Sequence, residues 1–84
     1  MVYTGQISAK VRTYDDYIYY FDNNASGQPV YEGCAEPGTS TSVTSWKIKR
    51  YTYDGKGAIL TILFAGGTKD FATAWSGRAA ASYS

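Results

Sequence analysis

The chain has 84 residues, with eight basic and seven acidic side chains and a net charge near +1. This length suits one domain, residues 1–84, which buries only about 60–65% of its unfolded surface and therefore has a small core. The balanced charge argues against nucleic acid as a partner, because the only basic cluster, Lys47, Lys49 and Arg50, is small.

Cys34 is the only cysteine and the chain contains no histidine. An intramolecular disulfide is therefore impossible, and a tetrahedral zinc site would have at most one soft ligand. We expect no metal and no cofactor. Association with further copies is the remaining way to stabilise so small a core, so a homo-oligomer is expected.

The N-terminal segment from Met1 to Arg12 lacks the apolar region of a signal peptide. No apolar run approaches the ~20 residues that a membrane-spanning helix needs. We therefore expect synthesis in the cytoplasm, where a lone cysteine stays reduced, and no membrane as partner.

The first two expected strands lie in the N-terminal third. Residues Ile7 to Val11 alternate between apolar and polar, which is typical of a half-buried strand. Tyr14 to Asp22 is richer in aromatic and β-branched residues, and both of its faces are apolar, so we expect it to be covered on both sides. The polar run Asn23 to Gly27 then predicts a chain reversal.

The middle of the chain predicts a short extended piece, a loop and a hairpin. Pro29 to Ala35 is the extended piece, which ends at Glu36-Pro37-Gly38, and the polar run Thr39 to Thr44 is expected to form an ordered surface loop. Ser45 to Tyr53 has the clearest alternation in the sequence, so it predicts a strand with one buried face. Asp54-Gly55 predicts a tight turn into the returning strand Ala58 to Phe64, which is apolar on both faces and is therefore expected to be central or covered.

The C-terminal part predicts a short helix near residues 69–76, capped by Thr68 or Asp70. Phe71 and Trp75, four residues apart, would share the face that docks on the sheet, and Gly77 would end the helix in a left-handed conformation. Residues 78–83 are expected to form a last edge strand, in which Arg78 pairs with a carboxylate such as Asp70.

The predicted fold is mainly β, a small antiparallel sheet or a sandwich or barrel of about five to six short strands with that one helix. The predicted structural core consists of Trp46, Ile48, Leu60, Ile62, Phe64, Phe71 and Trp75.

The residues of common catalytic sites are missing, so we expect no enzyme and no catalytic residue. The lack of histidine excludes serine–histidine and cysteine–histidine nucleophile pairs. Asp15 and Asp16 are adjacent, and neighbouring strand residues point to opposite faces, so they do not form an acid–base pair. Glu32 and Glu36 flank Cys34 and would raise its pKa rather than activate it.

Nine of the fourteen aromatic residues are tyrosine, which suits half-buried strand faces and wet interfaces. The expected interface residues are Tyr17, Tyr19, Tyr20, Tyr51 and Tyr53. Stacking on sugar rings is an alternative use of such tyrosines, so a carbohydrate-binding or adhesion module, with a glycan as its ligand, stays open as a second hypothesis.

The segment Tyr31 to Ser42, the strand Trp46-Lys47-Ile48-Lys49-Arg50, and the pattern Phe71, Trp75, Arg78, Ala79 occur in that order. Together they resemble small structural proteins of tailed bacteriophages, over about two thirds of the chain. The sequence departs from that pattern at residues 65–67 and 76–77, where acidic residues are usual.

The resemblance implies a virion protein made in the host bacterial cytoplasm, with copies of itself and other virion proteins as partners. Its position in the particle, at the neck, at the tail or decorating the head, stays open, with a slight preference for the neck or tail.

Overall fold

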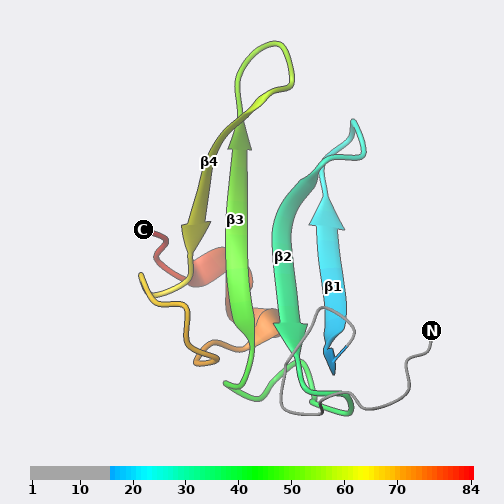
Figure 1. Ribbon diagram of the computed structural model, residues 1–84, viewed down its shortest axis with the longest axis vertical. Coiled ribbons are helices and arrows are strands. Elements are labelled where there is room, and N and C mark those ends of the chain that lie inside the picture. Colours follow the sequence, from blue (N-terminus) through cyan, green and yellow to red (C-terminus); the bar gives the residue numbers. More distant parts are fainter. Residues whose placement is uncertain (1–15) are drawn as a thin grey trace, which may run out of the picture.

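The computed structural model describes residues 16–84, which form one antiparallel sheet of four strands in chain order. The strands lie side by side (Figure 1): β1 (Ile18–Asn23), β2 (Pro29–Ala35), β3 (Lys47–Tyr53) and β4 (Ile59–Phe64). The predicted mainly-β antiparallel sheet is confirmed, with fewer strands than the five to six expected. The expected strand at Ile7 to Val11 lies outside the described residues.

The sheet consists of two hairpins that repeat one another thirty positions apart. In the first, the register runs from Tyr19 opposite Cys34 to Asn23 opposite Pro29. In the second, the register runs from Lys49 opposite Phe64 to Tyr53 opposite Ile59. Adding thirty to both residue numbers of each of these pairs in the first hairpin gives the corresponding pair in the second. The register also shifts at equivalent places, just before the last pair of each hairpin. β1 and β2 are therefore the structural equivalents of β3 and β4.

The two turns of these hairpins contain the same pattern of hydrogen bonds. The Asn24 side-chain oxygen accepts from the backbone N–H groups of residues 26 and 28, at 2.9 and 3.0 Å, and the Asp54 carboxylate accepts from residues 56 and 58, at 2.8 and 2.9 Å. Gly27 and Gly57 have φ angles of 83° and 90°, where glycine costs least. The Asp54-Gly55 pair predicts a positive φ at Gly55, but in the structure the positive φ of this turn lies at Gly57.

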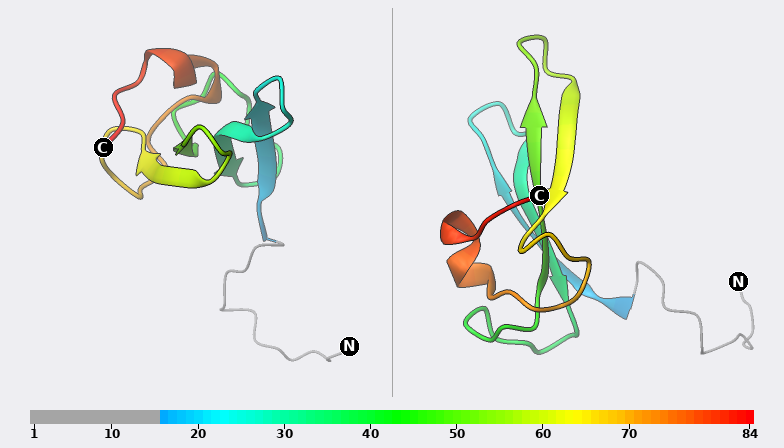
Figure 2. Two further views of the ribbon diagram at one scale, coloured as in Figure 1. Left: turned by 90° about the horizontal axis from the view of Figure 1, so that it is seen from above. Right: turned by 90° about the vertical axis from the view of Figure 1, so that its left-hand side faces the viewer.

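The C-terminal segment covers one face of the sheet, as both views in Figure 2 show. It contains the 3₁₀-helix η2 (Trp75–Ala80), which places Trp75 against the sheet. Trp46 and Trp75 pack with ring centroids 6.0 Å apart, and the Trp46 indole N–H donates to the Ser40 carbonyl at 2.9 Å. The buried cluster on this face comprises Ala35, Trp46, Ile48, Ala65 and Trp75.

Arg78 and Tyr83 hold this covering segment in place. The Arg78 guanidinium forms an ion pair with Asp22 of β1 at 3.0 Å and lies over the Trp75 ring, 4.4 Å from its centroid. The Tyr83 hydroxyl donates to the Arg78 carbonyl at 2.7 Å, and its ring packs on Tyr31. These contacts attach the segment to β1 and β2, and the hydrogen bond between Tyr83 and Arg78 joins the end of the segment to η2.

The C-terminal predictions need correction. Backbone hydrogen bonds between Trp46 and Thr73 keep residues 72–74 extended, so the helix begins only at Trp75 instead of near residue 69. Gly77 lies inside the helix and has no positive φ. Arg78 pairs with Asp22 rather than Asp70. Residues 78–80 of the expected last strand belong to the helix, and Tyr83 forms only a single β-bridge, with Ala65.

Three of the seven predicted core residues are exposed among the described residues. Leu60 and Ile62 are exposed because β4 is an edge strand, not the central or covered strand that its apolar sequence predicted. Phe71 precedes η2 and therefore stacks on Tyr17, at a centroid distance of 5.4 Å, instead of sharing a face with Trp75. The remaining four are buried or half-buried: Trp46, Ile48, Phe64 and Trp75.

The close approach of Trp75 to β2 gives the first testable prediction. A Cβ atom built at Gly33 would lie 2.5 Å from Cε3 of Trp75, so Gly33→Ala must displace the indole, and we expect a loss of about 1–3 kcal/mol in the free energy of unfolding. Gly55→Ala is the control, since a Cβ there meets no atom within 4 Å. Urea denaturation measures both variants, and equal stabilities would contradict the predicted packing.

Candidate functional site

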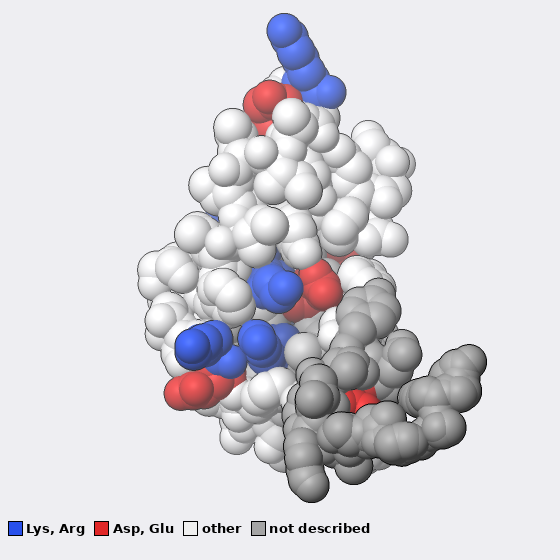
Figure 3. All heavy atoms as spheres, viewed as in Figure 1, with Lys and Arg blue, Asp and Glu red and all other residues white. Residues whose placement is uncertain are grey.

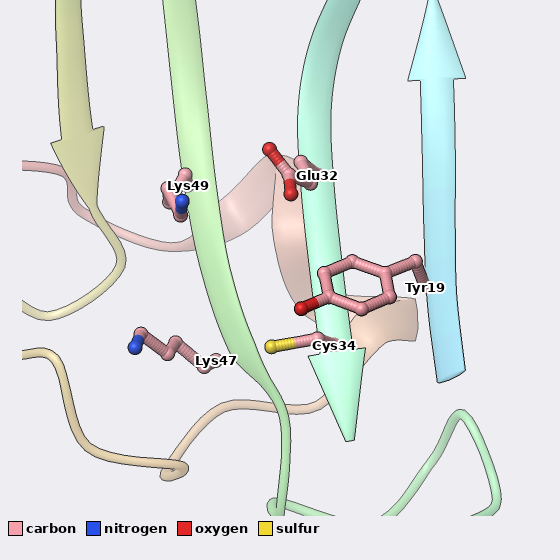
Figure 4. A pocket seen from close by; sticks show the side chains of 5 residues that line it. All are labelled: Tyr19, Glu32, Cys34, Lys47 and Lys49. Carbon is pink, nitrogen blue, oxygen red and sulfur yellow. The ribbon is translucent and has the colours of Figure 1, made fainter. Parts of the chain in front are cut away.

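The sheet face opposite η2 carries a pocket of about 180 Å³. Its lining comes from three adjacent strands: Tyr19 on β1, Glu32 and Cys34 on β2, and Lys47 and Lys49 on β3 (Figure 4). Cross-strand pairing brings these side chains together, since Cys34 lies opposite both Tyr19 and Lys47, and Glu32 lies opposite Lys49. Residues that are opposite in a sheet project to the same side, so the pairing register creates this pocket.

The pocket is rich in positive charge. Basic side chains gather over the lower half of this face (Figure 3), and neither Lys47 nor Lys49 forms an ion pair with a carboxylate of residues 16–84. The Lys47 ammonium lies over the Phe71 ring, 5.7 Å from its centroid. Glu32, the one acidic group of the pocket, accepts a hydrogen bond from the Tyr51 hydroxyl.

Cys34 is buried at the base of the pocket, and burial raises the pKa of its thiol above the ordinary value. Lys47 and Lys49 oppose this rise, whereas Glu32 adds to it. The expected effect of Glu32 is thus present, but desolvation is the larger cause and the effect of Glu36 does not appear. At neutral pH Cys34 is a thiol, which is a poor nucleophile.

The edge of β4 is the second notable feature of this side of the molecule. Its apolar side chains Ile59, Leu60 and Ile62 are 53%, 63% and 45% exposed. At one end of the edge, Phe64 exchanges two backbone hydrogen bonds of 3.1 Å with Ser84. Beyond that point, from Leu63 back to Ile59, no strand of the described part of the chain pairs with the outer edge.

The five tyrosines predicted as interface residues lie in different places. Tyr19 lines the pocket, and the Tyr51 and Tyr53 hydroxyls donate to Glu32 and to the Pro29 carbonyl. Tyr20 lies on the opposite face and packs on Trp46 and Trp75, with centroid distances of 5.0 and 5.8 Å. Tyr17 stacks on Phe71. They do not form one continuous aromatic platform.

The site residues that the sequence reasoning missed are the two lysines at the pocket and the exposed edge of β4. The alternation of Ser45 to Tyr53 had put Lys47 and Lys49 on one face, but the neighbours on that face come from other strands. Apolar residues on both faces of Ala58 to Phe64 predict burial, although the same composition also fits an edge that binds another chain.

Residues 16–84 contain no group of three or more histidine, cysteine, aspartate or glutamate side chains that could hold a metal ion. In the same range, no helix has the length and apolar character needed to cross a membrane. No protein-family model, no curated protein and no solved structure matches the chain.

The environment of Cys34 gives the second prediction. Alkylation by iodoacetamide, followed against pH, should show a higher midpoint in the folded protein than in the urea-unfolded chain, because burial favours the neutral thiol. Lys47→Met should move the midpoint up and Glu32→Gln should move it down. Since the folded chain holds this proton more tightly, the contribution of Cys34 to stability is present below the pKa of the unfolded chain and is lost as the pH rises through the higher pKa of the folded chain. A folded-state midpoint below that of the unfolded chain would disprove this description of the pocket.

Proposed function

We propose that this chain is a non-enzymatic structural or adaptor protein of a tailed-bacteriophage particle, present in repeated copies. It acts through protein–protein contacts at the neck, the tail or the head surface. The observation that carries the proposal is the outer edge of β4, where three large apolar side chains are about half exposed or more and with which no strand of residues 16–84 pairs.

An edge of this composition is unusual for a protein that works alone. Soluble proteins commonly protect sheet edges with charged residues or proline, and Ile59–Phe64 contains neither. Burying a leucine or isoleucine side chain contributes about 1.5–3 kcal/mol, so a partner on this edge would add substantially to a domain with a small core. Backbone hydrogen bonds to an added strand would align that partner.

The phage context depends on the sequence resemblance, and the positions of the motif residues support it. Trp46 and Trp75 are the two buried indoles, and Arg78 forms the ion pair that fastens the C-terminal segment to β1. Three residues of the pattern, Trp46, Trp75 and Arg78, thus attach this segment to the sheet. Their order and spacing therefore have a structural reason in this chain.

The alternative, a carbohydrate-binding module, gains no support from a particular observation. The expected sugar platform consists of Tyr17, Tyr19, Tyr51 and Tyr53, but the ring of Tyr17 stacks on Phe71. Tyr51 and Tyr53 use their hydroxyl groups for hydrogen bonds within the sheet. Protein contact at the β4 edge is therefore the function that the geometry supports best.

Quantitative mass spectrometry of purified particles from the phage or prophage that encodes the chain tests this function. We expect the protein at a fixed copy number relative to the major capsid protein. A number near that of the capsid protein would place it on the head, and about a dozen or fewer would place it at the neck or tail. Its absence from purified particles would refute the proposal.

A variant series tests whether β4 is the contact surface. Ile62→Lys puts a charge on the edge, so we expect at least about a tenfold loss of incorporation, since burying an unpaired charge costs several kcal/mol. Val43→Lys is the matched control, because Val43 lies in the loop before β3 and is 45% exposed, as is Ile62. Both variants should keep the parent melting temperature, and equal incorporation of the two would exclude the β4 edge as the contact surface.

A further inference from the structure

The repeat of the two hairpins relates the outer edge of β4 to an edge that is already paired. β4 is the equivalent of β2, and the outer edge of β2 pairs with β3. β3, in turn, is the equivalent of β1. The strand that fits the β4 edge by this relation is therefore β1 of a second copy of the chain.

The pairing of β2 with β3 also fixes the register of such a contact. Within one chain, Tyr31, Glu32 and Gly33 lie opposite Arg50, Lys49 and Ile48. Raising the first set by thirty positions and lowering the second by thirty gives the pairs between two copies: Thr61 with Tyr20, Ile62 with Tyr19, and Leu63 with Ile18.

The side chains in this register complement one another. Within one chain, β2 and β3 place Glu32 opposite Lys49. The equivalent pair in the contact between two copies is Ile62 opposite Tyr19. An aromatic and a β-branched residue opposite each other stabilise antiparallel strand pairing. The neighbouring rung would join Leu63 to Ile18, and none of these residues carries a charge that could repel its counterpart.

The backbone groups of β4 suit the same register. Phe64 directs its N–H and C=O away from β3 and bonds Ser84, whereas Ala65 donates towards β3, to Ile48, at 2.9 Å. Because these directions alternate along a strand, the N–H and C=O of Ile62 also point outward. No strand of residues 16–84 lies there. Ser84 already occupies the next rung at Phe64, so the added strand covers Thr61 to Leu63.

We infer that copies of this chain join head to tail, with β4 of one copy pairing antiparallel with β1 of the next in this register. The inference rests on the proposed function, because it specifies the contact through which repeated copies assemble. Such a contact uses two different edges, so it generates a ring or a filament rather than a closed two-fold dimer. Three rungs make a weak contact, and simultaneous engagement of both edges in a ring strengthens it.

Disulfide cross-linking between two variants tests the register. The rung of Leu63 and Ile18 corresponds to Gly33 opposite Ile48, where Ile48 directs its carbonyl to β4, so it is a pair without mutual backbone hydrogen bonds. In such pairs the Cα atoms lie ~4.5 Å apart, within the range that a disulfide requires. Full-length Leu63→Cys and Ile18→Cys chains, each with Cys34→Ala and a different mass tag, are mixed and oxidised under mild conditions.

We expect the mixed disulfide at about tenfold the yield of either homodimer, since only the matched cysteines meet the distance requirement. Leu63→Cys mixed with Tyr20→Cys is the control for register, because Tyr20 lies two residues away on the same face and should cross-link poorly. Circular dichroism checks that each variant folds. Thr61→Cys with Tyr20→Cys is a second matched pair, for use if Ile18→Cys fails to fold.

A dominant Leu63→Cys homodimer would overturn the inference in favour of a two-fold contact between β4 edges. Equal yields from matched and mismatched pairs, or no mixed disulfide from either matched pair, would also overturn it. Particle copy number reports separately on the proposed function. Presence in particles without the predicted cross-link refutes only the register, whereas absence from particles refutes the function itself.

Discussion

The described fold depends on the contact between the Trp75 indole and the backbone of β2 at Gly33. The missing side chain at Gly33 leaves the space into which Trp75 fits, and Trp46, just before β3, packs beside it. Without this contact, the sheet would have one curved layer and no cover on the face that contains Ile48 and Ala65. The ion pair of Arg78 with Asp22 and the bridge of Tyr83 to Ala65 position the cover, but the indoles provide its buried area.

Because the hairpins repeat, the outer edge of β4 has the same backbone geometry as the edge of β2 that pairs with β3. The two edges differ in their side chains. Between β2 and β3, the register places Glu32 opposite Lys49, so residues of opposite charge are neighbours on a partly solvated face, without forming an ion pair. The equivalent position at the outer edge carries Ile62, which has no such partner within the described chain. One backbone geometry thus serves first to join the hairpins and then to present an apolar edge.

Local patterns in the sequence predict most of the sheet and little of its surroundings. The alternation around Trp46 and Ile48 predicts β3 and its buried face, and the residues around Asn24 and Asp54 predict both reversals, because these signals lie within a few residues of each other. The edge position of β4 depends on strand order, which apolar content does not encode. The pairing of Arg78 with Asp22 joins residues 56 positions apart, and the pocket combines side chains of three strands, so neither has a local signal.

The position of Trp75 after the whole sheet in sequence has a consequence for the order of folding. Each hairpin closes a short turn, a local event that takes about 1–10 μs. Trp75 follows Phe64 by eleven residues and contacts Gly33, so its docking waits for both hairpins and closes a much longer loop. Until Trp75 docks, a chain in which only the hairpins have formed exposes two apolar surfaces: the face that contains Trp46 and Ile48, and the edge of β4.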